Sequence, residues 1–222
     1  MTRPSCSPSR LAAAAALVAL AACSEPAAPR IDPPAYDPTQ LSGVLYRWPT
    51  GRTVAVYTDP TAVSGGVDLA GATGAAMAAW KIALGGNQFA FRTATSAADA
   101  DVIVHVSGAP RLVGLAGCAE PPTFAGGVTF FCPASDSALT LPLASGAAGR
   151  VKVDISINPA ATSVANPLGA LVAHEIGHAV GIGGHSPQAL DVMFGSPAVS
   201  TPSARDIATL RWVVRQKIEL RL

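Results

Sequence analysis

The chain has 222 residues, of which 50% are hydrophobic and 13% are charged, and its formal net charge is +1. This composition excludes a chain that is disordered throughout, because that state needs low hydrophobicity and high net charge. The near-neutral balance, without a run of lysine or arginine, argues against nucleic-acid binding, which needs a clustered basic surface. No apolar stretch after residue 23 reaches the roughly 20 residues of a membrane-spanning helix.

Residues 1–22 have the form of an export signal. Arg3 and Arg10 precede LAAAAALVALAA, an apolar run over 11–22 that is too short to span a bilayer. The run ends in Leu20-Ala21-Ala22-Cys23, which resembles the lipobox of bacterial lipoproteins, where the cysteine becomes the acylated first residue. An ordinary signal peptide with a chance cysteine is the alternative. We therefore expect an exported protein with a lipid anchor at Cys23 in the bacterial cell envelope, its domain facing the periplasm or the extracellular space.

A proline-rich segment follows the predicted anchor. Residues 24–40 contain five prolines and no hydrophobic periodicity, which predicts an extended tether between the lipid and the domain. We therefore place a tether with its lipidated cysteine at 23–40 and the folded domain at 41–222. The domain contains two cysteines, Cys118 and Cys132, without Cys-x-x-Cys spacing. Because export favours oxidation, we predict a disulfide between them.

The predicted domain begins with a strand and a helix. Residues 52–58 (RTVAVYT) alternate and are β-prone, so they predict a strand that ends at Asp59-Pro60. The alanine-rich segment 67–84 predicts a helix that is closed by Gly85-Gly86. Its candidate buried positions are Leu69, Met77, Trp80 and Leu84.

More strands and two final helices complete the domain. Alternation and β-propensity predict strands over 88–93, 101–107, 127–132 and 150–158. Asn166-Pro167 predicts the start of a helix that ends near Gly181, since asparagine caps helices and proline suits their first position. A last helix is expected over 202–220, with Thr201 as its N-cap. An early helix, intervening strands and two late helices define an α+β layer structure.

The most specific pattern is His174-Glu175-Ile176-Gly177-His178, within the mostly apolar helix predicted over 166–181. Residues four apart share a helix face, so the two imidazoles converge on a point that a metal ion can bridge. Glu175 can reach a water on that ion without ligating it. This is the H-E-x-x-H arrangement of zinc hydrolases. The alternative, histidines that merely decorate a helix surface, is disfavoured because unpaired polar groups on an apolar helix are costly.

A third ligand is available close by in the sequence. A catalytic zinc takes three protein ligands and keeps one position open for water. Gly181 can end the helix in a left-handed conformation, after which the chain turns back and can deliver His185. Three of the four histidines of the chain lie between residues 174 and 185. This clustering favours a ligand set.

The segment HEIGHAVGIGGHS, followed by Asp191-Val192-Met193, resembles the metzincin zinc endopeptidases and most of all their matrixin branch. The resemblance spans 41–222 and is sharpest over 174–193. It implies a zincin-like domain with a twisted mixed five-stranded sheet and three helices, whose active-site helix carries H-E-x-x-H. It also implies one catalytic Zn²⁺ and the following roles: His174, His178 and His185 as ligands, Glu175 as general base, Gly181 as the turn glycine, and Met193 as the methionine of the turn beneath the zinc.

The sequence departs from the matrixin pattern at one place. Three residues, instead of two, separate Gly181 from His185. Gly183 and Gly184 supply backbone freedom that can absorb the extra residue. Asp191 is the alternative third ligand, since some related zinc enzymes use aspartate there. Its other possible role is structural, in the turn that it begins.

The resemblance implies hydrolysis of peptide bonds in a protein or peptide substrate. Zinc activates a water, and Glu175 takes its proton and returns it to the leaving amine. The substrate is expected to lie extended along the edge strand over 127–132, with residues 194–200 as one wall of the cleft. Two alternatives stay open. One is a non-catalytic surface lipoprotein that retains the fold, against which Glu175 argues; the other is a zinc amidase or peptidase that acts on cell-wall peptides.

The remaining predictions concern partners and further ions. We expect a monomer that binds no nucleic acid and meets the membrane only through its lipid. His105, in the strand over 101–107, is expected as a half-exposed strand residue instead of a ligand. Matrixins often carry a second, structural zinc and calcium. We predict neither, because residues 108–149 contain no histidine and Asp136 is their only aspartate.

Overall fold

The computed structural model describes residues 32–40, 45, 47, 48, 50–60, 68–85, 89–107, 126–132, 152–165 and 167–216. The signal segment 1–22, Cys23 and Cys118 lie outside these residues, as does the side chain of Cys132. The predicted export signal, lipid anchor and disulfide therefore stay predictions. Within the described part of the chain, no helix combines the length and apolarity needed to cross a bilayer.

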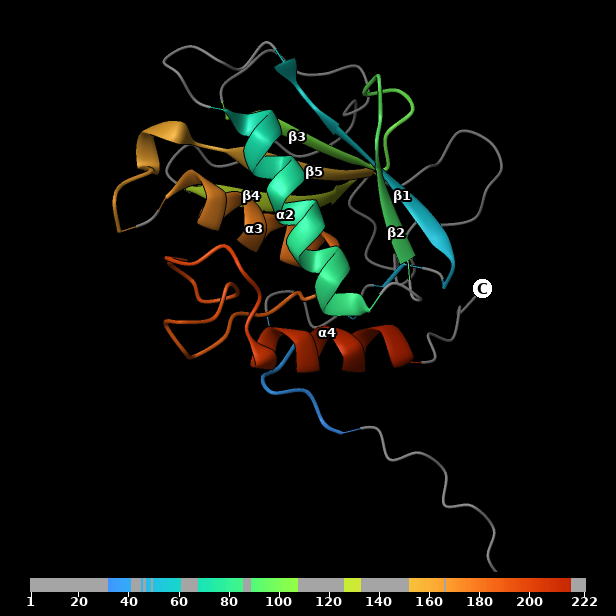
Figure 1. The fold of residues 1–222 in the computed structure, drawn as a ribbon, viewed down its shortest axis with the longest axis vertical. Coiled ribbons are helices and arrows are strands. Elements are labelled where there is room, and N and C mark those ends of the chain that lie inside the picture. The colour runs from blue at the N-terminus through green and yellow to red at the C-terminus, as the bar shows by residue number, and fades with distance from the viewer. Residues whose placement is uncertain are drawn as a thin grey trace, which may run out of the picture. The chain divides into compact units, whose positions relative to one another are not determined.

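Five strands form one mixed sheet in the order β2-β1-β3-β5-β4 (Figure 1). The first four strands in that order are parallel to one another, and β4, at the edge, is antiparallel to β5. The strands are β1 (Arg52–Thr58), β2 (Phe89–Thr93), β3 (Val102–Val106), β4 (Gly127–Cys132) and β5 (Lys152–Ile157). All five strand predictions are confirmed, with bounds that differ by at most two residues at either end.

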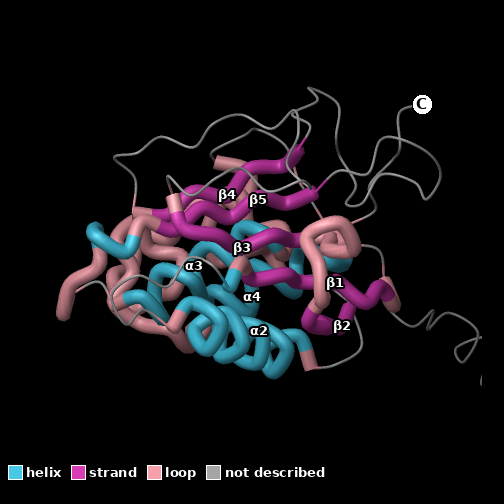
Figure 2. Tube along the Cα trace, turned by 90° about the horizontal axis from the view of Figure 1, so that it is seen from above, coloured by secondary structure: helices cyan, strands magenta, loops and turns pink. Residues whose placement is uncertain are grey.

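The three α-helices of the described residues lie on one side of this sheet (Figure 2). They are α2 (Leu69–Leu84), α3 (Leu168–Ala179) and α4 (Ala204–Arg215), and a short 3-10 helix, η3 (Pro159–Ala161), precedes α3. Alternation along the strands turns Val54, Val104 and Ile155 toward the helices, where they join the main hydrophobic core. The α+β architecture expected from the sequence is thus present, with the five-stranded mixed sheet and three helices.

Two buried tryptophans fix α3 in place. The indole N–H of Trp80, on α2, donates to the carbonyl of Ala173 at 2.8 Å, and that of Trp48 donates to the carbonyl of Ala179 at 2.8 Å. Both rings are fully buried in the core. Since a buried indole needs a partner for its N–H, each tryptophan packs against α3 and hydrogen-bonds to it. Helix α3 is thereby fixed at its middle and at its C-terminal end.

Helix α4 begins later than the sequence predicts. Its N-cap is Ser203, not Thr201: the Ser203 hydroxyl accepts from the N–H groups of Arg205 and Asp206, at 3.1 Å each. The Asp206 carboxylate accepts in turn from the Ser203 N–H at 2.9 Å. This reciprocal capping box satisfies three backbone N–H groups, so the cap lies where an acid follows three residues later. Residues 217–220 of the predicted helix lie outside the described residues.

Residues Asp32–Gln40, which the sequence places in the tether, pack against the domain instead; we call them the strap. The Tyr36 ring is 8% exposed and belongs to the main core, and its hydroxyl donates to Asp206 at 2.7 Å. The Ala35 N–H donates to the Thr209 hydroxyl at 3.1 Å. The domain therefore begins at Asp32 and not at Leu41. The described part of the predicted tether is not extended throughout, because residues 35 and 36 form a bend and residues 38–40 form a turn. Tyr36 gives this segment an apolar group to bury.

Candidate metal centre and active site

Helix α3 carries the H-E-x-x-H residues into the interior of the domain. All its residues from Ala170 to Ala179 are buried, because the helix lies between the sheet and α2. Val172 and Ile176 pack into the core, which fixes the rotation of the helix. His174, Glu175 and His178 are consequently held on buried surface in one orientation. The cap residue of α3 is Pro167, which supplies no side-chain hydrogen bond, and the predicted cap Asn166 lies outside the described residues.

Three histidines converge as the sequence predicts. One ring nitrogen from each of His174, His178 and His185 lies within 4.8 Å of the other two, and the Nε2 atoms of His174 and His178 are 3.0 Å apart. The ring centroids are 4.6, 5.1 and 5.3 Å apart in pairs. Among the residues that the structure describes, this is the one group of histidine, cysteine and acidic side chains close enough to hold a metal ion. The extra residue before His185 does not prevent it from joining the pair on α3.

Backbone carbonyls orient the two helical histidines. Nδ1 of His174 lies 2.8 Å from the carbonyl of Val192, and Nδ1 of His178 lies 2.6 Å from the carbonyl of Ile182. In each ring, Nδ1 is thus the N–H donor, which leaves a lone pair on Nε2. Carbonyl acceptors of this kind fix the tautomer and ring orientation of metal-ligating histidines. The two Nε2 atoms accordingly face the same small volume.

The electrostatics of the cluster favour uncharged imidazoles. Burial lowers the pKa of His174 to about 4, lowers that of His178 well below its ordinary value, and lowers that of His185 as well. The neighbouring histidines depress the pKa values of His174 and His178 further, because two imidazolium charges repel at this distance. At neutral pH the ring nitrogens are therefore available as metal ligands.

The turn after α3 uses its glycine as predicted. Gly181 has a φ of 117°, a region that favours glycine, and its N–H donates to the carbonyl of His178 at 2.9 Å. The next N–H, of Ile182, donates to the carbonyl of Gly177 at 3.1 Å. These two bonds satisfy carbonyls at the end of the helix and reverse the chain. The reversal lets His185 return to the face of α3 that carries the other histidines.

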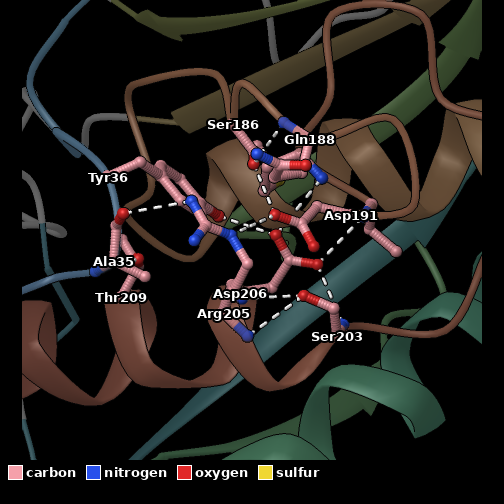
Figure 3. Close-up of polar contacts among 11 residues, drawn as sticks. Ala35, Tyr36, Ser186, Gln188, Asp191, Ser203, Arg205, Asp206 and Thr209 are labelled. Carbon is pink, nitrogen blue, oxygen red and sulfur yellow. Dashed lines mark hydrogen bonds and ion pairs between the residues drawn. The ribbon is translucent and has the colours of Figure 1, made fainter.

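Met193 and Asp191 stand in the turn beneath the cluster. Met193 is fully buried against Gly177 of α3, and its carbonyl accepts from the Ser186 N–H at 2.8 Å. The Asp191 carboxylate accepts from the Ser186 hydroxyl and, at 3.0 Å, from Nε of Arg205 (Figure 3). Burial alone would raise the pKa of Asp191, but these hydrogen bonds lower it below the ordinary value. Asp191 lies outside the histidine group and closes the turn, which is the structural role that the sequence left open for it.

Glu175 lies against the edge strand β4. It is 3% exposed, and its Oε2 accepts from the Thr129 hydroxyl at 2.6 Å. A Cβ at Gly127 would lie only 2.5 Å from the other carboxylate oxygen, so this glycine makes room for the acid. Burial raises the pKa of Glu175 to about 7, and the Thr129 hydrogen bond opposes that rise. A carboxyl group with a pKa near neutrality can both take up and release a proton.

Sequence reasoning missed Thr129 as a neighbour of Glu175. The Thr129 hydroxyl also lies 3.1 Å from the Glu175 carbonyl, so it holds both the side chain and the backbone of that residue. The available signal is the period of two in β4, which turns Gly127 and Thr129 to the same face of the strand. Gly127 leaves space for the Glu175 carboxylate, and Thr129 supplies a hydroxyl that donates a hydrogen bond to it.

His105 differs from its prediction. It is 7% exposed instead of half-exposed, and its Nε2 lies 2.6 Å from Oδ1 of Asp154 on β5. Burial alone would lower the pKa of His105, but the hydrogen bond and the negative charge of Asp154 outweigh it and raise the pKa. Both residues lie on the sheet face opposite the helices, since they alternate with core valines and isoleucines. The negative charge of Asp59 also raises the pKa of His105. Among the described residues, His105 belongs to no group of three ligating side chains, and its hydrogen bond joins it to Asp154.

Comparison with protein-family models and with curated proteins gave no match to this chain. The interpretation of the site consequently depends on the residues and the geometry described above.

Proposed function

We propose that this protein is a zinc-dependent endopeptidase, similar to the matrixin branch of the metzincins. The observation that carries the proposal is the convergence of His174, His178 and His185, with the buried Glu175 on the same helix as the first two. Three neutral imidazoles form the ligand set of a catalytic zinc, which needs a fourth position for water. Purely structural zinc sites are closed by four protein ligands, and the described residues offer three.

In the proposed hydrolysis, three histidines bind the metal and Glu175 transfers the proton. His174, His178 and His185 would hold Zn²⁺, which when bound acidifies a water and polarises the scissile carbonyl. Glu175 takes the proton of the attacking water and then donates it to the leaving amine, so no protein nucleophile is required. Thr129 holds the Glu175 carboxylate while it makes this transfer. Burial raises the pKa of Glu175 to about 7, so this carboxyl group can take up and release a proton near neutral pH.

The substrate we propose is an extended protein or peptide segment. Within the described residues, β4 pairs with β5 alone and carries Gly127 and Thr129, the two residues in contact with Glu175. A peptide that adds to the other edge of β4 would place its backbone beside the base, which is strand addition. Residues 194–200 follow Met193 and would form the next wall of the cleft. A monomer is sufficient for this site, because all its residues come from one chain.

We further propose that the enzyme works at the bacterial cell envelope. The export signal over 1–22 and the Leu20-Ala21-Ala22-Cys23 sequence support this location, with the domain in the periplasm or the extracellular space. A peptidase at that location has proteins, surface peptides and the peptides of the cell wall within reach. The substrate assay must therefore contain both proteins and cell-wall peptides.

The test is hydrolysis of casein, gelatin and purified cell-wall peptides by the purified protein. We expect cleavage of the proteins, loss of activity with a chelator, and recovery when Zn²⁺ is restored. Glu175→Ala should retain zinc and lose hydrolysis, because the base is removed and the ligands remain. Cleavage of cell-wall peptides alone would support the amidase alternative. A zinc-loaded wild type that cleaves nothing would support the non-catalytic lipoprotein.

A further inference from the structure

The strap, residues Asp32–Gln40, reaches the metal centre at its C-terminal end. The side-chain oxygen of Gln40 accepts a hydrogen bond from the backbone N–H of His185 at 3.1 Å, between residues 145 positions apart in the chain. A Cβ at Gly184 would overlap the carbonyl oxygen of Asp37 and would lie 3.1 Å from Cβ of Gln40. The strap is therefore in direct contact with the loop from Gly181 to His185, which we call the ligand loop. At this contact only glycine fits at position 184.

The end of the strap is shaped before it meets the loop. One oxygen of the Asp37 carboxylate accepts from both the N–H and the hydroxyl of Thr39, at 2.8 and 2.7 Å. Aspartate at this position closes a turn in which its own side chain replaces a backbone acceptor. The turn over residues 38–40 presents Gln40 to the loop. Little additional ordering is then needed when Gln40 bonds to His185.

The middle of the strap is connected to a second ligand. Tyr36 and the N–H of Val192 both donate to the carboxylate of Asp206, at 2.7 and 2.9 Å (Figure 3). The carbonyl of Val192 is in turn the acceptor for Nδ1 of His174. Burial and the nearby Asp206 raise the pKa of Tyr36, which keeps its hydroxyl protonated as the donor. The strap thus supports His185 directly and His174 through the Asp206 carboxylate and the backbone of Val192.

Arg205 completes this polar network. Its Nη2 donates to the carbonyl of Ala35 at 3.1 Å, and its Nε donates to Asp191 at 3.0 Å, so one guanidinium joins the strap to the turn beneath the cluster. No residue of the strap belongs to the histidine group itself. The strap acts on the orientation of the ligands and supplies none.

We propose that the strap positions the metal ligands, and that Gln40 is the residue through which it holds His185 against the other two histidines. This inference rests on the proposed zinc site. A ligand on a loop must give up conformational freedom when it binds a metal, and the freedom grows with the length of the loop. The loop from Gly181 to His185 is one residue longer than the pattern it resembles. The strap removes that freedom in advance, so that zinc binds to an ordered set of ligands.

The experiment compares zinc affinity among three variants of the full chain. Gln40→Ala removes the acceptor, Gln40→Glu retains it, and Gln188→Ala removes an exposed glutamine from the same loop as a matched control. Zinc dissociation constants are measured by competition with a chromophoric chelator. Melting temperatures are measured with and without zinc, and the Co²⁺ absorption spectrum reports on the ligand set. We expect zinc to bind about three- to tenfold more weakly to Gln40→Ala, the range for loss of one hydrogen bond. Gln40→Glu and Gln188→Ala should bind like the wild type.

A merely structural contact would give a different result. It would lower the melting temperatures of the metal-free and zinc-loaded forms equally and leave zinc affinity unchanged, which would overturn the inference. Gly184→Ala tests the same contact from the loop side, because its Cβ must displace the Asp37 carbonyl. It should weaken zinc binding at least as much as Gln40→Ala, and wild-type affinity in a folded Gly184→Ala protein would also overturn the inference. A wild type that binds no zinc would instead overturn the proposed function itself.

Discussion

The identity of the third ligand gives the sharpest prediction. Zinc sites with four protein ligands bind with about 10–16 kcal/mol, or about 2.5–4 kcal/mol per ligand. His185→Ala should therefore weaken zinc binding by a factor on the order of 100 to 1,000, as should His178→Ala. Asp191→Ala removes no ligand from the cluster. Its zinc affinity should stay within about tenfold of that of the wild type, which is the smallest loss typical of residues that orient metal ligands without binding the metal.

Asp191→Ala should instead act on the stability of the fold. The Asp191 carboxylate is buried and accepts from Ser186 and Arg205, so its removal leaves the buried Ser186 hydroxyl without that acceptor. A group left unpaired in this way costs about 1–3 kcal/mol of unfolding free energy. The measurements are chelator competition for zinc and denaturant unfolding of the metal-free protein. Strong zinc binding by His185→Ala, together with loss of zinc from Asp191→Ala, would refute the reasoning and make Asp191 the third ligand.

Three further predictions concern other parts of the chain. The raised pKa of His105 means that its ion pair with Asp154 stabilises the fold most below the unfolded pKa of about 6.5, and this stabilisation is lost as pH rises through the folded pKa. The stability difference between wild type and Asp154→Asn should therefore shrink between pH 5.5 and pH 8.5, whereas a constant difference would contradict the assignment. Cys118 and Cys132 should resist alkylation in the denatured, non-reduced protein; modification of both would exclude the disulfide. Cys23→Ser should release the protein from membranes, and a variant that still pellets after a high-salt wash would exclude the lipid anchor.

Local patterns predicted much of the fold and most of the site. The β-prone segment RTVAVYT predicts both ends of β1 correctly, although the strand is buried on both faces at Val54, Ala55 and Val56 instead of alternating in burial. The spacing of His174 and His178 predicts their convergence, since a helix brings residues four apart together. The predicted left-handed conformation of Gly181 is confirmed by its φ of 117°. Each of these features depends on neighbours within one element or one turn.

The features that the sequence did not predict depend on distant partners. The Tyr36 hydroxyl can be buried because Asp206, 170 residues later, accepts a hydrogen bond from it. A local pattern in a proline-rich segment cannot predict a partner so distant in the sequence. His105 is on the predicted face of its strand, but the burial of that face depends on the packing around the sheet, and its partner Asp154 is 49 residues away. The cap of α4 was within reach of sequence reasoning. Ser203 and Asp206 form a capping-box spacing, which is a more specific signal than the threonine at 201.

The packing of the strap against the domain shortens the chain that is left to connect the domain to the proposed lipid anchor. If Cys23 bears the lipid, as we propose, residues 24–34 separate it from Ala35, the first residue of the strap that is hydrogen-bonded to α4. At about 3.5 Å for each residue, this connection spans at most roughly 40 Å even when fully extended. The domain is then confined to a layer next to the membrane surface. Within that layer, peptides displayed by neighbouring membrane proteins and lipoproteins reach a high effective concentration at the proposed active site, whereas proteins free in solution meet it only when they approach the bilayer.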